Sequence, residues 1–188
     1  MENHQQESGM GLVYTASLPV EIKVLTEEPD TISITEIQQV NYRVLRQVLT
    51  LEEQVTDAQL YHDDSRHGTR DIQRVEAKVD LLLDLLGGLI QLQIPKPLSR
   101  KVIVSNTAIQ IAGIPADFQS QSGWLMVLLY LHAYSIEPLR ILVNTGTNMT
   151  HVGDQQFRMH FAHFTDGERD LLEKIIFRHH RKSIARNR

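Results

Sequence analysis

The sequence predicts an α+β protein in which two long helices precede a smaller region built mostly from β-strands. Two stretches in the first half repeat their apolar residues at alternating spacings of three and four. This spacing is typical of a helix that packs along one face. Beyond Pro97 the chain changes to short apolar runs separated by Gly and Pro, a texture that indicates strands and turns.

The chain begins with a polar segment and a strand-like one. Residues 1–11 lack the apolar core of a signal peptide, and we expect them to be disordered. Residues 12–30 contain partly alternating β-branched residues, and they are predicted to add one or two strands to the β region. Pro19 is expected at a bend or a sheet edge, because proline has no N–H to donate.

The first helix has a recognisable start. Ser33 and Glu36 fit a capping box, and Ile32 and Ile37 are spaced as a hydrophobic staple. The helix is predicted to run to about Tyr61. Its repeated positions are Ile34, Ile37, Asn41, Val44, Val48, Leu51 and Val55.

The second helix follows a charged loop at 62–68 and ends before Pro95, because proline interrupts a helix. Its repeated positions are Ile72, Val75, Val79, Leu82, Leu86 and Leu89. With Ile72 as position a, the later e and g positions are also apolar, namely Leu83, Leu85, Ile90 and Leu92. Such a wide apolar stripe favours neighbours on more than one side.

We therefore predict that residues 31–94 mediate homo-oligomerisation, with a trimer or tetramer favoured over a dimer. Asn41 at an a position would fix the register. The residues assigned to this interface are Ile37, Asn41, Val44, Val48, Leu51, Ile72, Val75, Val79, Leu82, Leu86 and Leu89. The alternative is that the helices form an antiparallel hairpin within one chain and pack on its β region.

Residues 95–188 are predicted to form the β region and a C-terminal helix. The expected strands lie within 101–111, 124–132, 139–147 and 155–164. The last helix should begin near Asp166, because Thr165 and Glu168 make a second capping box. After it comes a basic end, in which Arg178, Arg181 and Lys182 are candidates for binding a protein partner. The simpler interpretation is that these cations complement the helix dipole.

Composition excludes several classes of function. The chain has no cysteine, so disulfides and thiolate metal sites are excluded. The formal charge of −4 gives no general attraction to nucleic acid. The most apolar stretch, 79–94, is too short for membrane insertion and holds two Asp. We expect a cytoplasmic protein with no catalytic residues, no metal site and no cofactor.

The segment beyond Pro97 resembles a PilZ domain. The resemblance rests on the order of the strand VSNTAIQI, a Gly123-led apolar run, a strand after Pro138, the F-x-M-x-F strand at 157–161 and the closing FTDGERDLL. Upstream, VEAKVDLLLDLLGGLIQL is similar to the helical extension of atypical, xanthomonad-type PilZ proteins. The resemblance implies an antiparallel β-barrel and a role in signalling, bacterial motility or virulence.

PilZ domains typically bind cyclic di-GMP through an R-x-x-x-R arm and a [D/N]-x-S-x-x-G strand. Aligning Ser105 with the serine of that strand places Ile103 and Ala108 where the other two motif residues are expected. The candidate ligand residues are therefore only Ser105 and Arg100. Arg66 and Arg70 match the spacing of the arm, but they precede a helix and not the first strand of the domain.

We therefore predict a non-catalytic adaptor that self-assembles, contacts an unidentified protein partner and does not bind cyclic di-GMP. One alternative is a cyclic di-GMP receptor that uses other arginines. Another is a purely structural coiled-coil protein.

Overall fold

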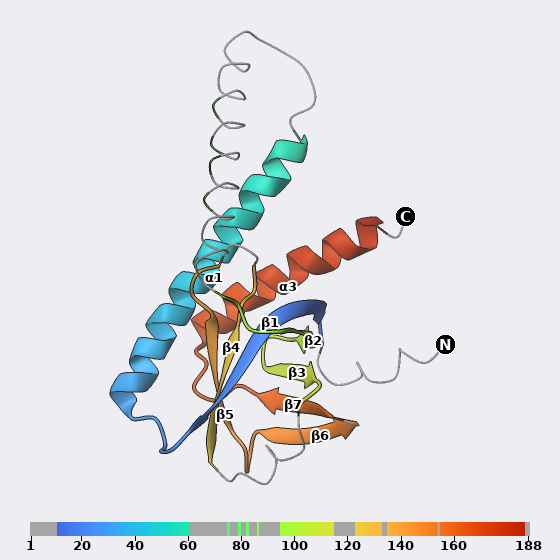
Figure 1. The fold of residues 1–188 in the computed structure, drawn as a ribbon. Helices are drawn as coiled ribbons and strands as arrows, with labels where there is room; N and C mark the ends of the chain where they lie inside the picture. Colours follow the sequence, from blue (N-terminus) through green and yellow to red (C-terminus); the bar gives the residue numbers. More distant parts are fainter. Residues whose placement is uncertain are drawn as a thin grey trace.

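The computed structural model describes residues 11–60, 75, 79, 82, 86, 95–114, 123–132, 135–153 and 155–186. Seven antiparallel strands form one sheet, against which two helices pack (Figure 1). The elements are β1 (Tyr14–Leu25), α1 (Thr31–Leu60), β2 (Ser99–Val104), β3 (Ala108–Ala112), β4 (Trp124–Leu129), β5 (Leu139–Asn144), β6 (Met149–Gly153), β7 (Gln156–His160) and α3 (Asp166–Arg186). The strand order is β5-β4-β1-β2-β3-β7-β6.

Strand β1 joins the two halves of the sheet. Its first half, Tyr14–Pro19, pairs with β2, and its second half, Val20–Leu25, pairs with β4. The change of partner falls at Pro19, whose carbonyl accepts a hydrogen bond from the Tyr130 N–H at 3.1 Å. The predicted strand is therefore one long element, and Pro19 stands where the pairing changes sides.

The sheet is open, which corrects the predicted β-barrel. Closure would require the end strands β5 and β6 to pair, and the sheet order leaves them as separate edges. At β5 the outward backbone groups are already used. Asn41 bonds both the N–H and the C=O of Arg140, at 2.8 Å each, and the Ala162 N–H donates to the Leu142 carbonyl at 2.8 Å.

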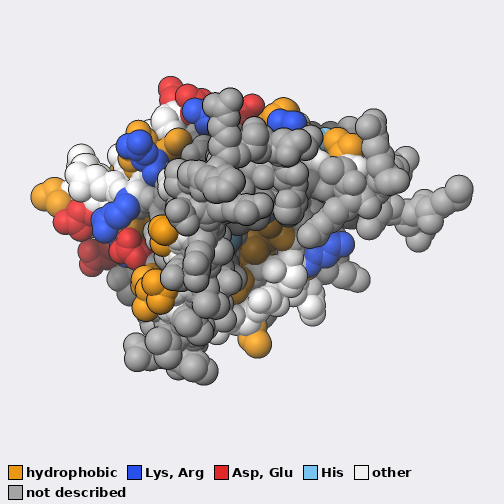
Figure 2. All heavy atoms as spheres, turned by 90° about the horizontal axis from the view of Figure 1, so that it is seen from above, with side chains coloured by type: hydrophobic (Ala, Val, Ile, Leu, Met, Phe, Trp, Pro, Cys, Tyr) orange, Lys and Arg blue, Asp and Glu red, His pale blue; other side chains and the backbone are white. Residues whose placement is uncertain are grey.

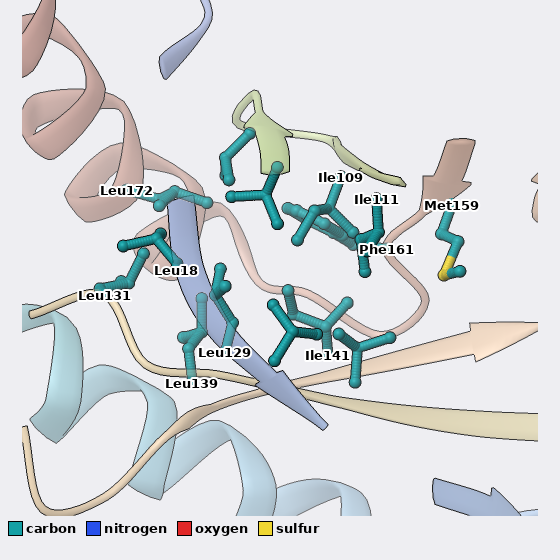
Figure 3. Packing of buried hydrophobic residues seen from close by; sticks show 14 of the residues in the cluster. Leu18, Ile109, Ile111, Leu129, Leu131, Leu139, Ile141, Met159, Phe161 and Leu172 are labelled. Carbon is teal, nitrogen blue, oxygen red and sulfur yellow. The ribbon is translucent and has the colours of Figure 1, made fainter. Parts of the chain in front are cut away.

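The core lies between the sheet and the two helices (Figure 3). The part of this core next to Leu172 of α3 contains Leu18, Leu129, Leu131 and Leu139. The part farther from α3 contains Ile109, Ile111 and Phe161. The buried residues of β2 and β7 alternate with more exposed ones, as expected for strands with one face toward a core, whereas β3 is buried along most of its length.

Helix α1 packs against α3 and β5 of its own chain. Its most buried side chains recur at helical spacing and are Ile37, Asn41, Val44, Leu45, Val48 and Leu49. The N-terminal cap is Asp30, which accepts a hydrogen bond from the Ser33 N–H at 2.8 Å, so the helix starts earlier than the predicted Ser33–Glu36 box. Hydrogen bonds from Ser33, first its side chain and then its backbone, lower the pKa of Asp30.

The second predicted capping box is confirmed. The Thr165 N–H donates to the Glu168 carboxylate at 2.7 Å, and the Glu168 N–H donates to the Thr165 hydroxyl at 3.2 Å. Glu168 is buried, and its other oxygen accepts a hydrogen bond from the Asn41 amide at 2.9 Å. The start of α3 is thereby joined to the middle of α1.

The predicted strands are present with two differences. The run 101–111 divides into β2 and β3, because Ser105–Thr107 make a tight turn. Strand β6 was not predicted from the sequence, because its MTHVG residues show no apolar alternation.

Asn41→Ala tests the network that joins α1, β5 and α3. The substitution leaves the Arg140 backbone groups without their side-chain partner and removes one hydrogen bond from the buried Glu168 carboxylate. We expect the free energy of unfolding to fall by about 2–4 kcal/mol in urea denaturation. Gln39→Ala, on the exposed face of the same helix, is the control and should change it by less than about 0.5 kcal/mol. Equal effects of the two substitutions would contradict this role for Asn41.

Candidate functional site

A row of exposed apolar side chains lies between α1 and β2. The four residues that the structure describes in this stretch are all helical, and each is half exposed or nearly so. The exposed fractions are 60% for Val75, 46% for Val79, 58% for Leu82 and 54% for Leu86. We call these four residues the 75–86 stripe.

The spacing of the 75–86 stripe places all four side chains on one side of a helix. At about 100° per residue, steps of four, three and four residues keep them within an arc of about 60°. Single exposed hydrophobic residues are common on protein surfaces and are seen at several places in Figure 2. A continuous row of four at heptad spacing is different, because it matches the contact line of a helical bundle.

Among its described side chains, the first helix offers no comparable row. Ile37, Val44 and Val48 were assigned to oligomerisation, but their exposed fractions are 7%, 1% and 1% within one chain. Asn41 is also 1% exposed, and its amide nitrogen donates hydrogen bonds to the Arg140 carbonyl and the Glu168 carboxylate. Such side chains have almost no surface left for a second copy. For these residues the spacing serves packing within the chain, and their part in oligomerisation stays a prediction.

The remaining members of the predicted interface are less constrained. Leu51 is partly buried near the point where the described side chains of α1 end. Ile72 and Leu89, and the apolar e and g positions of the second helix, lie outside the described residues. The candidate interface therefore rests on the 75–86 stripe.

Ser105 has a structural role in the turn between β2 and β3. Its side chain is fully buried, and its hydroxyl oxygen accepts hydrogen bonds from the Ala108 N–H at 2.9 Å and the Thr107 N–H at 3.2 Å. The hydroxyl also donates to the Ala108 carbonyl at 3.1 Å. The hydroxyl is thus bonded inside the turn, and a role for Ser105 in ligand binding stays a prediction.

Arg100 is also engaged within the chain. Its guanidinium donates a hydrogen bond to the carbonyl of Gly113, just beyond the end of β3. Gly113 adopts a φ of 75°, and the Arg100 Nη1 lies so close that a Cβ at Gly113 would be 3.1 Å from it. The structure therefore gives Arg100 a role in fixing a loop, and it lies apart from the buried Ser105 hydroxyl.

The basic candidates on α3 have different surroundings. Arg178 is partly buried and donates a hydrogen bond to the Leu49 carbonyl of α1 at 2.9 Å, which makes it a link between helices. Arg181 is exposed, and its guanidinium carbon lies 6.0 Å from the centre of the Phe177 ring. Lys182 lies in α3, but its side chain is outside the described residues.

Two exposed apolar residues on the same helix were not singled out from the sequence. Phe177 is 50% exposed and Ile184 is 47% exposed. Their separation of seven residues is a signal that the sequence contains, because positions seven apart on a helix share one side.

The acidic, histidine and lysine side chains that the structure describes differ in their contacts. Within the described ranges no group of three His, Asp or Glu side chains could hold a metal ion. His163 stacks on Trp124 and His179 on Tyr14, with ring centres 5.5 Å and 4.0 Å apart. Burial lowers the pKa of Lys96, whose ammonium lies 5.6 Å from the centre of the Tyr130 ring.

The described part of the chain also contains no helix that is long and apolar enough to cross a membrane. The sheet with its two packed helices thus defines a small α+β domain that presents an apolar helical stripe.

Comparison with known proteins identifies the family. Residues 45–188 match the family described as "Atypical PilZ domain, cyclic di-GMP receptor". This chain therefore belongs to the atypical PilZ domain family, which confirms the resemblance that the sequence indicated. A search of curated proteins found no match.

A solved structure from Xanthomonas campestris has a similar fold. It is a pathogenic protein described as a new tetrameric PilZ domain that self-assembles via an unusual helical bundle. The TM-score is 0.62 and the sequence identity 24%, and the match covers 93% of this chain and 91% of that one. At this identity the likeness establishes a shared fold.

Ser105→Ala tests whether the serine serves the turn. The substitution removes the acceptor for one buried and one partly buried N–H group, so we expect the free energy of unfolding to fall by about 1–3 kcal/mol. Urea denaturation measures the change, and Ser17→Ala, at an exposed position of β1, is the control. A variant as stable as the unmodified protein would show that the turn does not depend on this hydroxyl.

Proposed function

We propose that this chain is a non-catalytic PilZ-family adaptor that self-assembles through the 75–86 stripe and acts by protein contacts. The single observation that carries the proposal is the exposure of Val75, Val79, Leu82 and Leu86 on one side of a helix. Their spacing fits a bundle contact, and all four side chains are about half exposed.

The stripe can supply a useful part of an association free energy. Burying a Val or Leu side chain completely contributes about 1.5–3 kcal/mol, and each of these four is already about half buried. Burying the remainder would therefore contribute about 3–6 kcal/mol per copy, before the entropy cost of association. In a bundle, the 75–86 stripes of several copies would pack against one another along a common axis.

A tetramer is the copy number we infer. The Xanthomonas campestris protein with the similar fold is described as a tetramer built by a helical bundle. The second helix of this chain has a broad apolar pattern, which favours more than two neighbours. The buried side chains of α1 are compatible with this arrangement. They pack within their own chain, so α1 and the sheet need not change when the second helices of several copies associate.

We also propose that the β2–β3 turn of this chain is not a cyclic di-GMP site. Two of the three expected motif positions are occupied by Ile103 and Ala108, which offer no polar group. The third, Ser105, has a buried hydroxyl that bonds within the turn. Regulation would then pass through a protein partner, as the sequence predicted, with motility or virulence as the setting that the resemblance implies.

A second candidate function is a cyclic di-GMP receptor that uses other residues. The description of the family as a cyclic di-GMP receptor favours it. Arg66 and Arg70, which match the spacing of the ligand arm, lie outside the described residues.

Assembly is tested by light scattering coupled to size exclusion. We expect a tetramer of about 86 kDa, four times the 21.5 kDa chain. Leu82→Asp combined with Leu86→Asp should lower the mass towards that of one chain, because buried carboxylates oppose the contact. Ile136→Asp, an exposed apolar position elsewhere at 47% exposure, is the matched control and should leave the mass unchanged. A monomeric unmodified protein would refute the proposal.

Nucleotide binding is tested by calorimetric titration of the intact protein with cyclic di-GMP. We expect no heat of binding at micromolar protein, because the expected polar groups of the strand motif are missing or used in the turn. Binding with a submicromolar constant would support the second candidate. Arg66→Ala with Arg70→Ala would then show whether the arm-like pair is responsible.

A further inference from the structure

The exposed side of α3 changes character along its length. Phe177 and Ile184 are seven residues apart, which places them on one side of the helix and about 10 Å apart along its axis. Arg181 lies between them, exposed, with its guanidinium carbon 6.0 Å from the centre of the Phe177 ring. Figure 1 shows this end of α3 at the edge of the molecule, close to the C-terminus.

The charged residues that follow Glu173 along the chain have one sign. After Glu173 the sequence contains no further acid, and six cations follow it in the last fifteen residues. They are Lys174, Arg178, Arg181, Lys182, Arg186 and Arg188. Lys174 and Arg181 are exposed, whereas Arg178 is bonded to the Leu49 carbonyl of α1. The net charge of −4 does not cancel this local excess, because salt screens charges beyond about 10 Å.

The basic surface has a defined limit. Asp170 and Glu173 share the same side of α3 but precede Phe177, and Glu173 accepts a hydrogen bond from Asn106 at 3.2 Å. The first half of the helix is therefore acidic on this side. Any anionic surface would contact α3 only from Lys174 onward.

Exposed aromatic and aliphatic residues surrounded by Lys and Arg are the pattern of helices that bind anionic bilayer surfaces. A protein partner is favoured less, because a stable interface buries about 800 Å² on each side and needs a larger apolar centre than two side chains. A bilayer needs only shallow insertion of apolar groups together with several cations near the lipid phosphates. The cations after Glu173 complement that negative surface.

We propose that the second half of α3 docks on an anionic lipid bilayer, with Phe177 and Ile184 entering the headgroup region and Arg181 contacting lipid phosphate. This surface is separate from the 75–86 stripe. In a tetramer several copies could bind one bilayer together, which would strengthen the binding by avidity. Only this last point rests on the proposed assembly.

The test is sedimentation of the full chain with vesicles. Vesicles of phosphatidylcholine with about one third phosphatidylglycerol should carry the protein down at about 50 mM salt, and pure phosphatidylcholine vesicles should not. Raising the salt to about 500 mM should weaken binding at least tenfold. Equal sedimentation with both kinds of vesicle, or none with the anionic ones, would overturn the proposal.

Three variants locate the surface. Phe177→Ser with Ile184→Ser, and separately Arg181→Glu, should each weaken vesicle binding about tenfold or more. Both keep the core, because the residues changed are exposed, and thermal unfolding verifies this. Phe177→Trp should retain binding, and its fluorescence should shift to shorter wavelength with anionic vesicles, beyond any change from Trp124. Unchanged binding of both loss variants would refute the assignment to α3.

Controls separate the remaining outcomes. Ile136→Ser and Lys101→Glu change exposed residues elsewhere and should leave vesicle binding unaltered. Poly-glutamate that binds while anionic vesicles do not would identify a contact with acidic protein instead and would contradict the proposal. Leu82→Asp with Leu86→Asp should lower both the mass and the apparent vesicle affinity. A monomeric unmodified protein that still needs Phe177 and Ile184 for vesicle binding would refute the assembly alone.

Discussion

The side chain of Asn41 is the interaction on which the arrangement of this domain depends. Its amide oxygen accepts the Arg140 N–H and its amide nitrogen donates to the Arg140 carbonyl, so it occupies the outer edge of β5 much as a neighbouring strand would. The same nitrogen donates to Glu168, which caps α3. Because these groups are buried, each depends on the others for its hydrogen bonds, and α1, β5 and α3 are held in one arrangement.

This network explains why two helices with the same spacing have different surroundings. Once Asn41 fixes α1 against β5, the neighbouring Val44 and Val48 face the core and are lost to any contact between copies. The 75–86 stripe has no such polar anchor among its described residues, and its side chains remain exposed. The sheet stays open, with β5 and β6 as its two separate edges.

In β2 and the β2–β3 turn, the candidate ligand residues of this chain bond to its own backbone, although the family is described as a cyclic di-GMP receptor. The chain belongs to a family described as a cyclic di-GMP receptor, yet Ser105 bonds within its own turn and Arg100 bonds the Gly113 carbonyl. Polar groups remain at these positions, but they hold backbone in place. The two surfaces that we propose for recognition are helical, namely the apolar 75–86 stripe and the basic second half of α3.

The sequence by itself determined the local features. The positions of β1, α1 and α3 and the Thr165–Glu168 cap follow from short-range patterns, because caps and alternation act over a few residues. The sequence could not show what the apolar face of α1 packs against, since periodicity shows only that a helix has such a face. Only the tertiary structure decided that Asn41 binds Arg140, that the sheet stays open and that Ser105 is buried. Each of these depends on residues far apart in the chain, whose proximity no local pattern records.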